Sequence, residues 1–280
     1  MTLTSTISLA RFGTAAALTL LLAAPASAAT VTIPFDADNF TDPLDIDNQY
    51  WPLVPGTTFV YIGEGPDGCE VDRFTVTNDT KLITINGENL TVRVIDDRAY
   101  EDDECDGADP GELVEKTFDW HAQDDAGNIW YFGEETYHCE GEGNCTLGSG
   151  SWEAGKDIQN TGAIAMPGII ILANPTTGDA YRQEIYTGFA EDWAKIMGKN
   201  ADVVLKRDDA YPPGEFDNCL VTKEWSGLDP GSVEQKYYCS GVGLVLVTEH
   251  SGKVLRSELT GGAAASANKD AFTFRTVPKH

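Results

Sequence analysis

The sequence predicts a mainly β protein: one large antiparallel curved sheet, or a two-layer sandwich or half-barrel, with one short helix and disulfide staples. Three observations lead to this fold class. Short apolar runs alternate with polar residues at a period of two. Turn residues separate the runs at the close spacing typical of antiparallel strands. Six cysteines occur in a chain that begins like an exported protein, which indicates disulfides.

The predicted sheet is centred on a hairpin, Glu112–Glu135. Its first arm alternates between an apolar and a polar face, Phe118, Trp120 and Ala122 against Thr117, Asp119, His121 and Gln123. Residues 124–128, Asp-Asp-Ala-Gly-Asn, are of types that favour a turn. The returning arm, Ile129–Phe132, is apolar on both faces, which is typical of a central strand covered on both sides.

The N-terminus, residues 1–28, has the pattern of a secretory signal peptide. Arg11 gives the positive region, 14–24 is a short apolar run, and Ala26-Ser27-Ala28 is a small-residue cleavage site. The apolar run is shorter than the ~20 residues that a membrane span needs. We therefore expect a soluble, secreted or periplasmic protein without membrane insertion.

The mature chain is expected to have three parts. Residues 29–56 form an acidic N-terminal arm, 57–260 a single antiparallel β domain, and 261–280 a linker and tail. The arm carries two Asp-x-Asp pairs that could bind calcium, Asp36 with Asp38 and Asp45 with Asp47. The central Gly and distal Glu of an EF-hand are missing, so the alternative is a solvated arm that lies along the sheet.

The β domain is expected to follow a meander. An Asn86-Gly87 turn signal joins two of its strands. The expected strands are 58–62, 70–77, 81–85, 90–95, 169–173, 179–186, 202–207, 219–225, 233–239, 244–249 and 254–259.

One helix is predicted at 189–197. Phe189, Trp193, Ile196 and Met197 recur at helical spacing, and Gly198 would end the helix.

The six cysteines are expected to form three disulfides. Cys139–Cys145 would close a Gly-rich loop and Cys219–Cys239 would tie two strands, which leaves Cys69–Cys105 by elimination. Neither CxxC nor HxxxH spacing occurs, so the sequence gives no support to a zinc site.

The formal net charge of −26 argues against nucleic-acid binding, which depends on neutralisation of phosphates by Lys and Arg. Motifs for a nucleophile elbow, a phosphate loop or a zinc protease are absent. We therefore expect no catalytic residues and no cofactor other than calcium.

The candidate ligand-binding residues are mostly aromatic. Trp152, in a long loop, could form an aromatic floor for a sugar or lipid with Trp130 and Tyr131. Tyr181 and Glu184, on the predicted strand 179–186, complete this set. The alternatives are that the aromatic residues are plain core and that Glu184 pairs with Arg182. Glu184, Glu191 and Asp192 could also converge as a metal-binding or acid/base cluster.

Several stretches resemble an uncharacterised family of secreted bacterial β-rich proteins. They are the hairpin 112–135, NQYWPLVPGTTFVYIGE (48–64), GSWEAG (150–155), GDAYRQEIYTGFAEDWA (178–194), TKEWSGLDPGSVEQKYYC (222–239) and SGVGLVLV (240–247). The segment 237–259 is also similar to the closing hairpin of LolA-like curved-sheet envelope proteins. The resemblance implies a fold and a compartment but no reaction, and no catalytic role for His121.

The expected function is that of an exported binding or structural protein that holds an apolar or carbohydrate ligand on a sheet face. A calcium-binding envelope protein is one alternative. A polysaccharide hydrolase that uses a carboxylate pair is the other.

Overall fold

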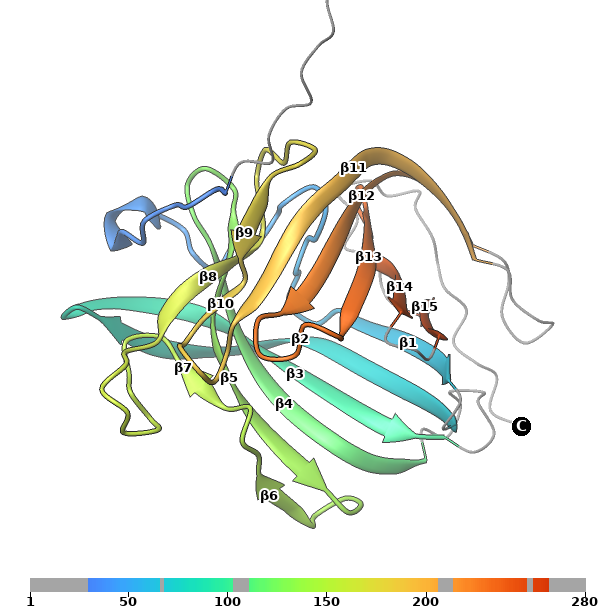
Figure 1. The fold of residues 1–280 in the computed structure, drawn as a ribbon, viewed down its shortest axis with the longest axis horizontal. Helices are drawn as coiled ribbons and strands as arrows, with labels where there is room; N and C mark the ends of the chain where they lie inside the picture. The colour runs from blue at the N-terminus through green and yellow to red at the C-terminus, as the bar shows by residue number, and fades with distance from the viewer. Residues whose placement is uncertain (1–29, 66–67, 103–110, 206–213, 251–253, 262–280) are drawn as a thin grey trace, which may run out of the picture.

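A computed structural model, which describes residues 30–65, 68–102, 111–205, 214–250 and 254–261, contains an antiparallel sheet of 15 strands curled into a half-barrel (Figure 1). The predicted fold class is therefore confirmed. The predicted signal peptide and C-terminal tail lie outside the described residues. In chain order the strands are β1 (Thr58–Gly65), β2 (Gly68–Ile85), β3 (Glu88–Glu101), β4 (Glu112–Gln123), β5 (Ile129–Cys139), β6 (Cys145–Leu147), β7 (Trp152–Glu153), β8 (Met166–Ile171), β9 (Ala180–Arg182), β10 (Glu184–Ile185), β11 (Asp192–Leu205), β12 (Gly214–Ser226), β13 (Val233–Cys239), β14 (Gly243–His250) and β15 (Val254–Gly261).

The two ends of the sheet meet at one short stretch of chain. The strand order is β10-β8-β5-β4-β3-β2-β1-β15-β14-β13-β12-β11-β9, and its end members β9 and β10 are consecutive in the sequence. β9 pairs with β11, whereas β10 pairs with β8. Between them, the Gln183 N–H donates to the Asp192 carbonyl at 2.8 Å. Residues 180–185 therefore join both edges and give the curled sheet an enclosed inner face.

The β2–β3 hairpin follows directly from its turn residues. Asn86 and Gly87 have φ values of 55° and 89°, and Ile85 pairs with Glu88 across them. Positive φ at both loop positions matches the twist of the flanking strands, which is why Asn-Gly favours this turn. The predicted strands 70–77 and 81–85 are one continuous strand, with a register shift between Val76 and Thr80.

The predicted helix at 189–197 is wrong, because most of that stretch belongs to strand β11. Ala194 and Ile196 are buried, while Met197 is 43% exposed. Alternate burial of this kind is typical of a strand. The four residues at helical spacing that predicted a helix were too few to exclude a strand. β11 pairs with β12 on one side and β9 on the other, and such cross-strand packing outweighs local propensity. Among the described residues, helical geometry is found in the 3₁₀ turn Ala37–Asn39 (η1).

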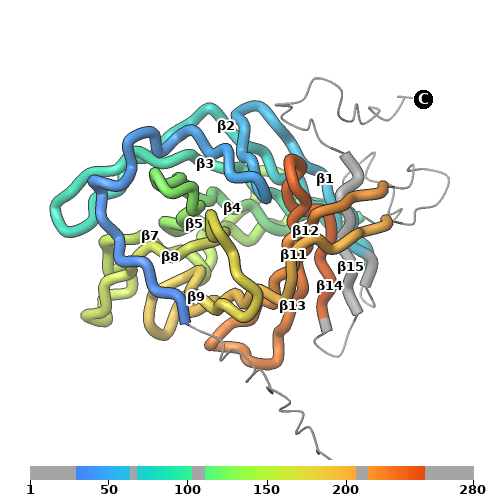
Figure 2. The backbone as a smooth tube through the Cα atoms, turned by 90° about the horizontal axis from the view of Figure 1, so that it is seen from above, coloured from blue at the N-terminus to red at the C-terminus, as the bar shows by residue number. Residues whose placement is uncertain are grey.

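The acidic N-terminal arm crosses one rim of the curled sheet (Figure 2). Its backbone is hydrogen-bonded in turn to β9, to the β4–β5 turn and to the β13–β14 turn, through Val31 with Ala180, Asn39 with Asp125, and Gln49 with Gly241. Its apolar side chains belong to the main hydrophobic core, namely Phe40, Ile46, Tyr50, Trp51 and Leu53. The arm therefore lies along the sheet with its apolar side chains in the core, while its five aspartates are exposed to solvent.

Strand β5 is covered on both faces, as its apolar pattern predicted. Trp130 and Phe132 pack edge-on against Phe35 and Phe40 of the arm. Tyr131 points to the opposite, inner face, where its ring stacks on His121 with 4.8 Å between centroids.

Two of the predicted disulfides are confirmed. Cys139–Cys145 and Cys219–Cys239 each join residues that are direct partners on paired strands. Cys69 is also disulfide-bonded, and its predicted partner Cys105 lies outside the described residues.

The β4–β5 turn depends on the buried side chain of Asp124. Its carboxylate accepts hydrogen bonds from the Ala126 N–H, from the Asn128 N–H and side-chain amide, and from Trp130 Nε1, at 2.8 to 3.0 Å. We expect Asp124→Ala to lower the free energy of unfolding by about 3 kcal/mol, because it leaves buried donors without an acceptor. Urea denaturation measures this loss. Asp79→Ala, at an exposed position, is the matched control, and an equal effect of both variants would contradict the assignment.

Candidate functional site

A pocket of about 200 Å³ lies between the two walls of the curled sheet. We call it the interior pocket. It combines aromatic and apolar side chains with five carboxyl groups and one lysine. Its lining consists of Trp51, Phe74, Asp97, Asp119, His121, Tyr131, Ile170, Gln183, Glu184, Asp192, Glu224 and Lys236.

A bulge in β5 brings two polar side chains to this inner face. Tyr131 pairs with His121 and Glu134 pairs with Asp119, so two residues of β5 lie opposite the single residue Trp120 of β4. Gly133 adopts φ 124° within the bulge, and a Cβ atom there would overlap the Trp152 carbonyl oxygen. Only glycine fits both constraints. As a result, Tyr131 and Glu134, three positions apart, both reach Asp119.

Asp119 and Glu134 are linked through the hydroxyl group of Tyr131. The Tyr131 oxygen lies 2.6 Å from Asp119 Oδ1 and 2.8 Å from Glu134 Oε2. A tyrosine hydroxyl has one hydrogen to donate. Both short contacts are hydrogen bonds only when one carboxyl group is protonated and donates to the Tyr131 oxygen. The geometry therefore indicates at least one neutral carboxyl group in this trio.

The carboxyl groups of the inner face form a row in which each raises the pKa of its neighbour. Burial is the main cause, and it raises four pKa values to about 8. The charge of a neighbour adds to it: Asp119 acts on Asp97, and Glu134 acts on Asp119. In the same way Glu184 acts on Glu134, and Asp192 acts on Glu184. Because desolvation and like charge both favour the neutral acid, the row holds protons near neutral pH.

The basic groups of the pocket do not compensate this row. Burial lowers the pKa of His121 to about 4, so its imidazole is neutral at pH 7. Lys236 Nζ lies 3.1 Å from Glu224 and 3.1 Å from Glu234. Burial lowers the pKa of Lys236, but those two charges outweigh it and the net shift is upward. Lys236 is therefore charged and paired with Glu224 and Glu234, and its charge only partly offsets the rise in the pKa of Glu184 and of Asp192.

Three buried polar atoms on pocket residues lack a hydrogen-bond partner within the described part of the chain. They are the donors Trp51 Nε1 and Gln183 Nε2 and the acceptor Asp97 Oδ1. Most buried polar groups in folded proteins are hydrogen-bonded, and an unsatisfied one costs about 1–3 kcal/mol. Three such atoms around one pocket indicate that bound water or a ligand completes it.

The structure brings part of the predicted ligand-binding set together. Tyr131 and Glu184 both line the pocket, and Trp152 packs edge-on behind Tyr131 at 5.4 Å. Tyr181 is buried nearby and donates to the Ile170 carbonyl at 3.2 Å. Trp130 lies on the opposite face of β5, so the three predicted aromatic residues do not form one floor.

Two alternatives were predicted for Glu184, an ion pair with Arg182 and a cluster with Glu191 and Asp192. The structure shows no ion pair between Arg182 and Glu184; the Arg182 guanidinium lies over the Trp193 ring at 5.0 Å. Glu184 and Asp192 do meet at the pocket, whereas Glu191 accepts from the Gly188 N–H.

Asp97, Glu134, Gln183 and Lys236 were not among the predicted site residues. Asp119 and His121 were predicted on the polar face of a strand, and a polar face normally meets solvent. One feature of the sequence could have indicated the site: Asp119 and His121 lie on a central strand of a sheet with enough strands to curl.

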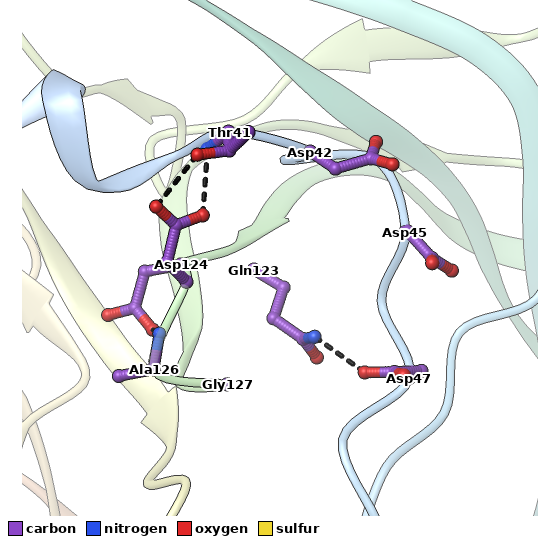
Figure 3. A pocket seen from close by; sticks show the side chains of 9 residues that line it. Thr41, Asp42, Asp45, Asp47, Gln123, Asp124, Ala126 and Gly127 are labelled. Atoms are coloured by element: carbon purple, nitrogen blue, oxygen red, sulfur yellow. Dashed lines mark hydrogen bonds between the residues drawn. The ribbon is translucent and has the colours of Figure 1, made fainter.

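The predicted calcium ligands are divided between two places. Asp45 and Asp47 line an acidic pocket of about 310 Å³ beside the β4–β5 turn (Figure 3). Asp36 instead caps η1 by accepting from the Asp38 N–H. In the acidic pocket Asp47 accepts from Gln123 at 2.7 Å. No group of three or more His, Cys, Asp and Glu within the described ranges is arranged to hold a metal ion.

Calcium binding is thus a proposal that a melting experiment tests. Calcium held by Asp45 and Asp47 would raise the melting temperature more than magnesium does at equal ionic strength, because a ligand that binds only the native state stabilises it. The double variant Asp45→Asn/Asp47→Asn would abolish the difference. Equal shifts with both ions would leave these acids as surface charge.

The comparisons with known proteins give no family. No family model matches the sequence, and no curated protein matches it. Two solved structures match: a protein described as a lipoprotein from Parabacteroides distasonis (13% identity, TM-score 0.37, 77% of this chain and 99% of that one) and one described as exported, with a YmcC-like fold, from Bacteroides fragilis (10%, 0.38, 76% and 98%). Within the described residues, no helix is both long and apolar enough to span a membrane.

The raised pKa values predict an inverse dependence of stability on pH. Between about pH 5 and pH 8 the native state holds protons that the unfolded chain has released, so the free energy of unfolding falls as pH rises. The slope is at most about 1.4 kcal/mol per pH unit for each such group. Asp119→Asn, which keeps the acceptor for Tyr131, should flatten this dependence and stabilise the protein at pH 8.5. Urea denaturation at pH 5.5, 7 and 8.5 measures it. Asp79→Asn is the control, and an unchanged slope in Asp119→Asn would contradict the prediction.

Proposed function

We propose that this protein is an exported binding protein whose interior pocket holds a small polar ligand of the carbohydrate class. The observation that carries the proposal is the set of three unpartnered buried atoms, Trp51 Nε1, Gln183 Nε2 and Asp97 Oδ1. Two are donors and one is an acceptor. A hydroxyl-rich ligand has both kinds of group and can satisfy all three.

The composition of the pocket favours a sugar over the predicted apolar alternative. Five carboxyl groups line it beside Trp51, Phe74 and Tyr131. An apolar ligand would leave the polar atoms without partners, which is costly. A sugar ring combines apolar C–H faces, which pack on aromatic rings, with hydroxyl groups at its rim. Binding sites of this kind pair apolar walls with a few placed polar groups.

Binding rather than hydrolysis is proposed because Asp119 and Glu134, two adjacent carboxyl groups of the inner face, are not arranged as a glycosidase pair. A glycosidase holds two carboxyl groups on opposite sides of the scissile bond, about 5 to 9 Å apart. Asp119 and Glu134 are direct cross-strand partners bridged by one hydroxyl group. A sugar cannot lie between them while that bridge is intact.

Export is supported by residues within the described part of the chain. The two cross-strand disulfides Cys139–Cys145 and Cys219–Cys239 are typical of oxidising compartments. The predicted signal peptide at 1–28 agrees with them. Secreted and periplasmic locations both fit this chemistry.

A pocket-filling variant tests the proposed function. Ile170 lines the pocket, so Ile170→Trp should occupy its volume and reduce ligand affinity at least tenfold. Ile164, which is 55% exposed outside the pocket, supplies the control Ile164→Trp. The probes are glucose, galactose, N-acetylglucosamine and glucosamine, assayed by thermal unfolding. A ligand at ~100 times its dissociation constant stabilises the native state by about 2.7 kcal/mol. Binding that survives Ile170→Trp, or no stabilisation by any probe, would overturn the proposal.

A further inference from the structure

We infer that the interior pocket selects a cationic, hydroxylated ligand, an amino sugar or amino alcohol whose ammonium group lies beside Asp97. This inference rests on the proposed function and specifies the ligand class for the same pocket. It depends on the charge balance of the inner face, on the unpartnered atom of Asp97 and on the aromatic walls.

Acidic groups outnumber basic groups in the pocket. Five carboxyl groups and one lysine line it, and Lys236 is held by Glu224 and Glu234. The remaining four, Asp97, Asp119, Glu184 and Asp192, have no ion-pair partner within the described ranges. A buried carboxylate without a counter-charge is costly, and either a proton or a bound cation removes that cost.

Of these four carboxyl groups, that of Asp97 is best placed to bind the cation. Its Oδ1 atom is buried and has no hydrogen-bond partner, whereas Asp119 already shares the Tyr131 hydroxyl. The titratable groups that face Asp97 are acids or a neutral phenol: Asp72 of β2, Asp96 of β3, Glu115 and Asp119 of β4, and Tyr61 of β1. An ammonium group at this point would meet acceptors, and the lysine that lines the same pocket, Lys236, is bound to Glu224 and Glu234.

A bare metal ion fits this pocket poorly. No three acidic, histidine or cysteine side chains in the described parts of the chain are arranged around one point as metal ligands. The pocket volume of about 200 Å³ corresponds to roughly six or seven water molecules at ~30 Å³ each. That space suits a single sugar ring or a small amine. The walls formed by Trp51, Phe74 and Tyr131 also suit an organic cation, which aromatic faces attract.

The two unpartnered donors require acceptors on the same ligand. Trp51 Nε1 and Gln183 Nε2 can each donate one hydrogen bond. An alkylammonium ion without oxygen atoms could not accept them. Hydroxyl oxygens can, so the ligand class is a hydroxylated amine rather than a simple amine.

Binding of such a cation should release protons. Asp97, whose pKa burial and the charge of Asp119 raise to about 8, is mostly protonated at pH 7. A neighbouring ammonium group favours the carboxylate, so the proton leaves when the ligand binds. A neutral sugar exerts no such effect.

The experiment compares glucosamine with glucose and N-acetylglucosamine at pH 7, by isothermal titration calorimetry in two buffers of different ionisation enthalpy. We expect glucosamine to bind at least tenfold more tightly than either neutral sugar and to release protons. Asp97→Asn should reduce glucosamine affinity at least tenfold, because an ion pair becomes a hydrogen bond from the ammonium group to a neutral amide, and should abolish the proton release. Asp97→Asn replaces a mostly protonated acid with a neutral amide of the same shape, so it should fold.

Equal affinity for the three sugars, each blocked by Ile170→Trp, would overturn the inference and leave the proposed function standing. No binding of any of the three would overturn both. Tighter glucosamine binding without proton release, or unaffected by Asp97→Asn, would also overturn the assignment of Asp97.

Discussion

The structure depends on the pairing of residues 180–185 with both ends of the same sheet. β9 pairs with β11 and β10 pairs with β8, and only Gln183 separates the two short strands. Without this joint the sheet would have two open edges and one solvent-facing surface. With it, the inner face is enclosed. Side chains that would otherwise be an ordinary polar face become a buried row of acids.

That enclosure changes the chemistry of the acids. In water, Asp119 and Glu134 would ionise independently near pH 4. Inside the curled sheet they share the Tyr131 hydroxyl, and at least one retains its proton. The protein thereby avoids burying several like charges, but it keeps groups whose deprotonation costs stability as pH rises. Natural proteins commonly retain such unfavourable groups at binding sites, and the unpartnered atoms around the same pocket agree with that interpretation.

Much of the fold could be predicted because it rests on local patterns. The Asn86-Gly87 turn sets the β2–β3 register, the alternation of β4 identifies a strand, and the cysteines at 139 and 145 lie close enough in sequence to indicate their pairing. The prediction of a helix at 189–197 was wrong because it used local spacing alone. Strand pairing between residues far apart in the sequence decided the structure there. Trp193 stacks on Trp225 of β12 with 6.1 Å between ring centroids, a contact that no window around residue 193 contains.

The sequence by itself determined the mainly β class, the hairpins, the disulfide pairs of the described residues and the two-sided covering of β5. Each of these follows from residues near one another in the chain. Only the tertiary structure decided which polar face is enclosed. Asp97, Asp119, Glu134, Glu184 and Lys236 come from five different strands, and they meet because the sheet curls and closes through 180–185. Curling is a property of many strand pairings together, so no single strand reveals whether its polar side meets water or lines a pocket.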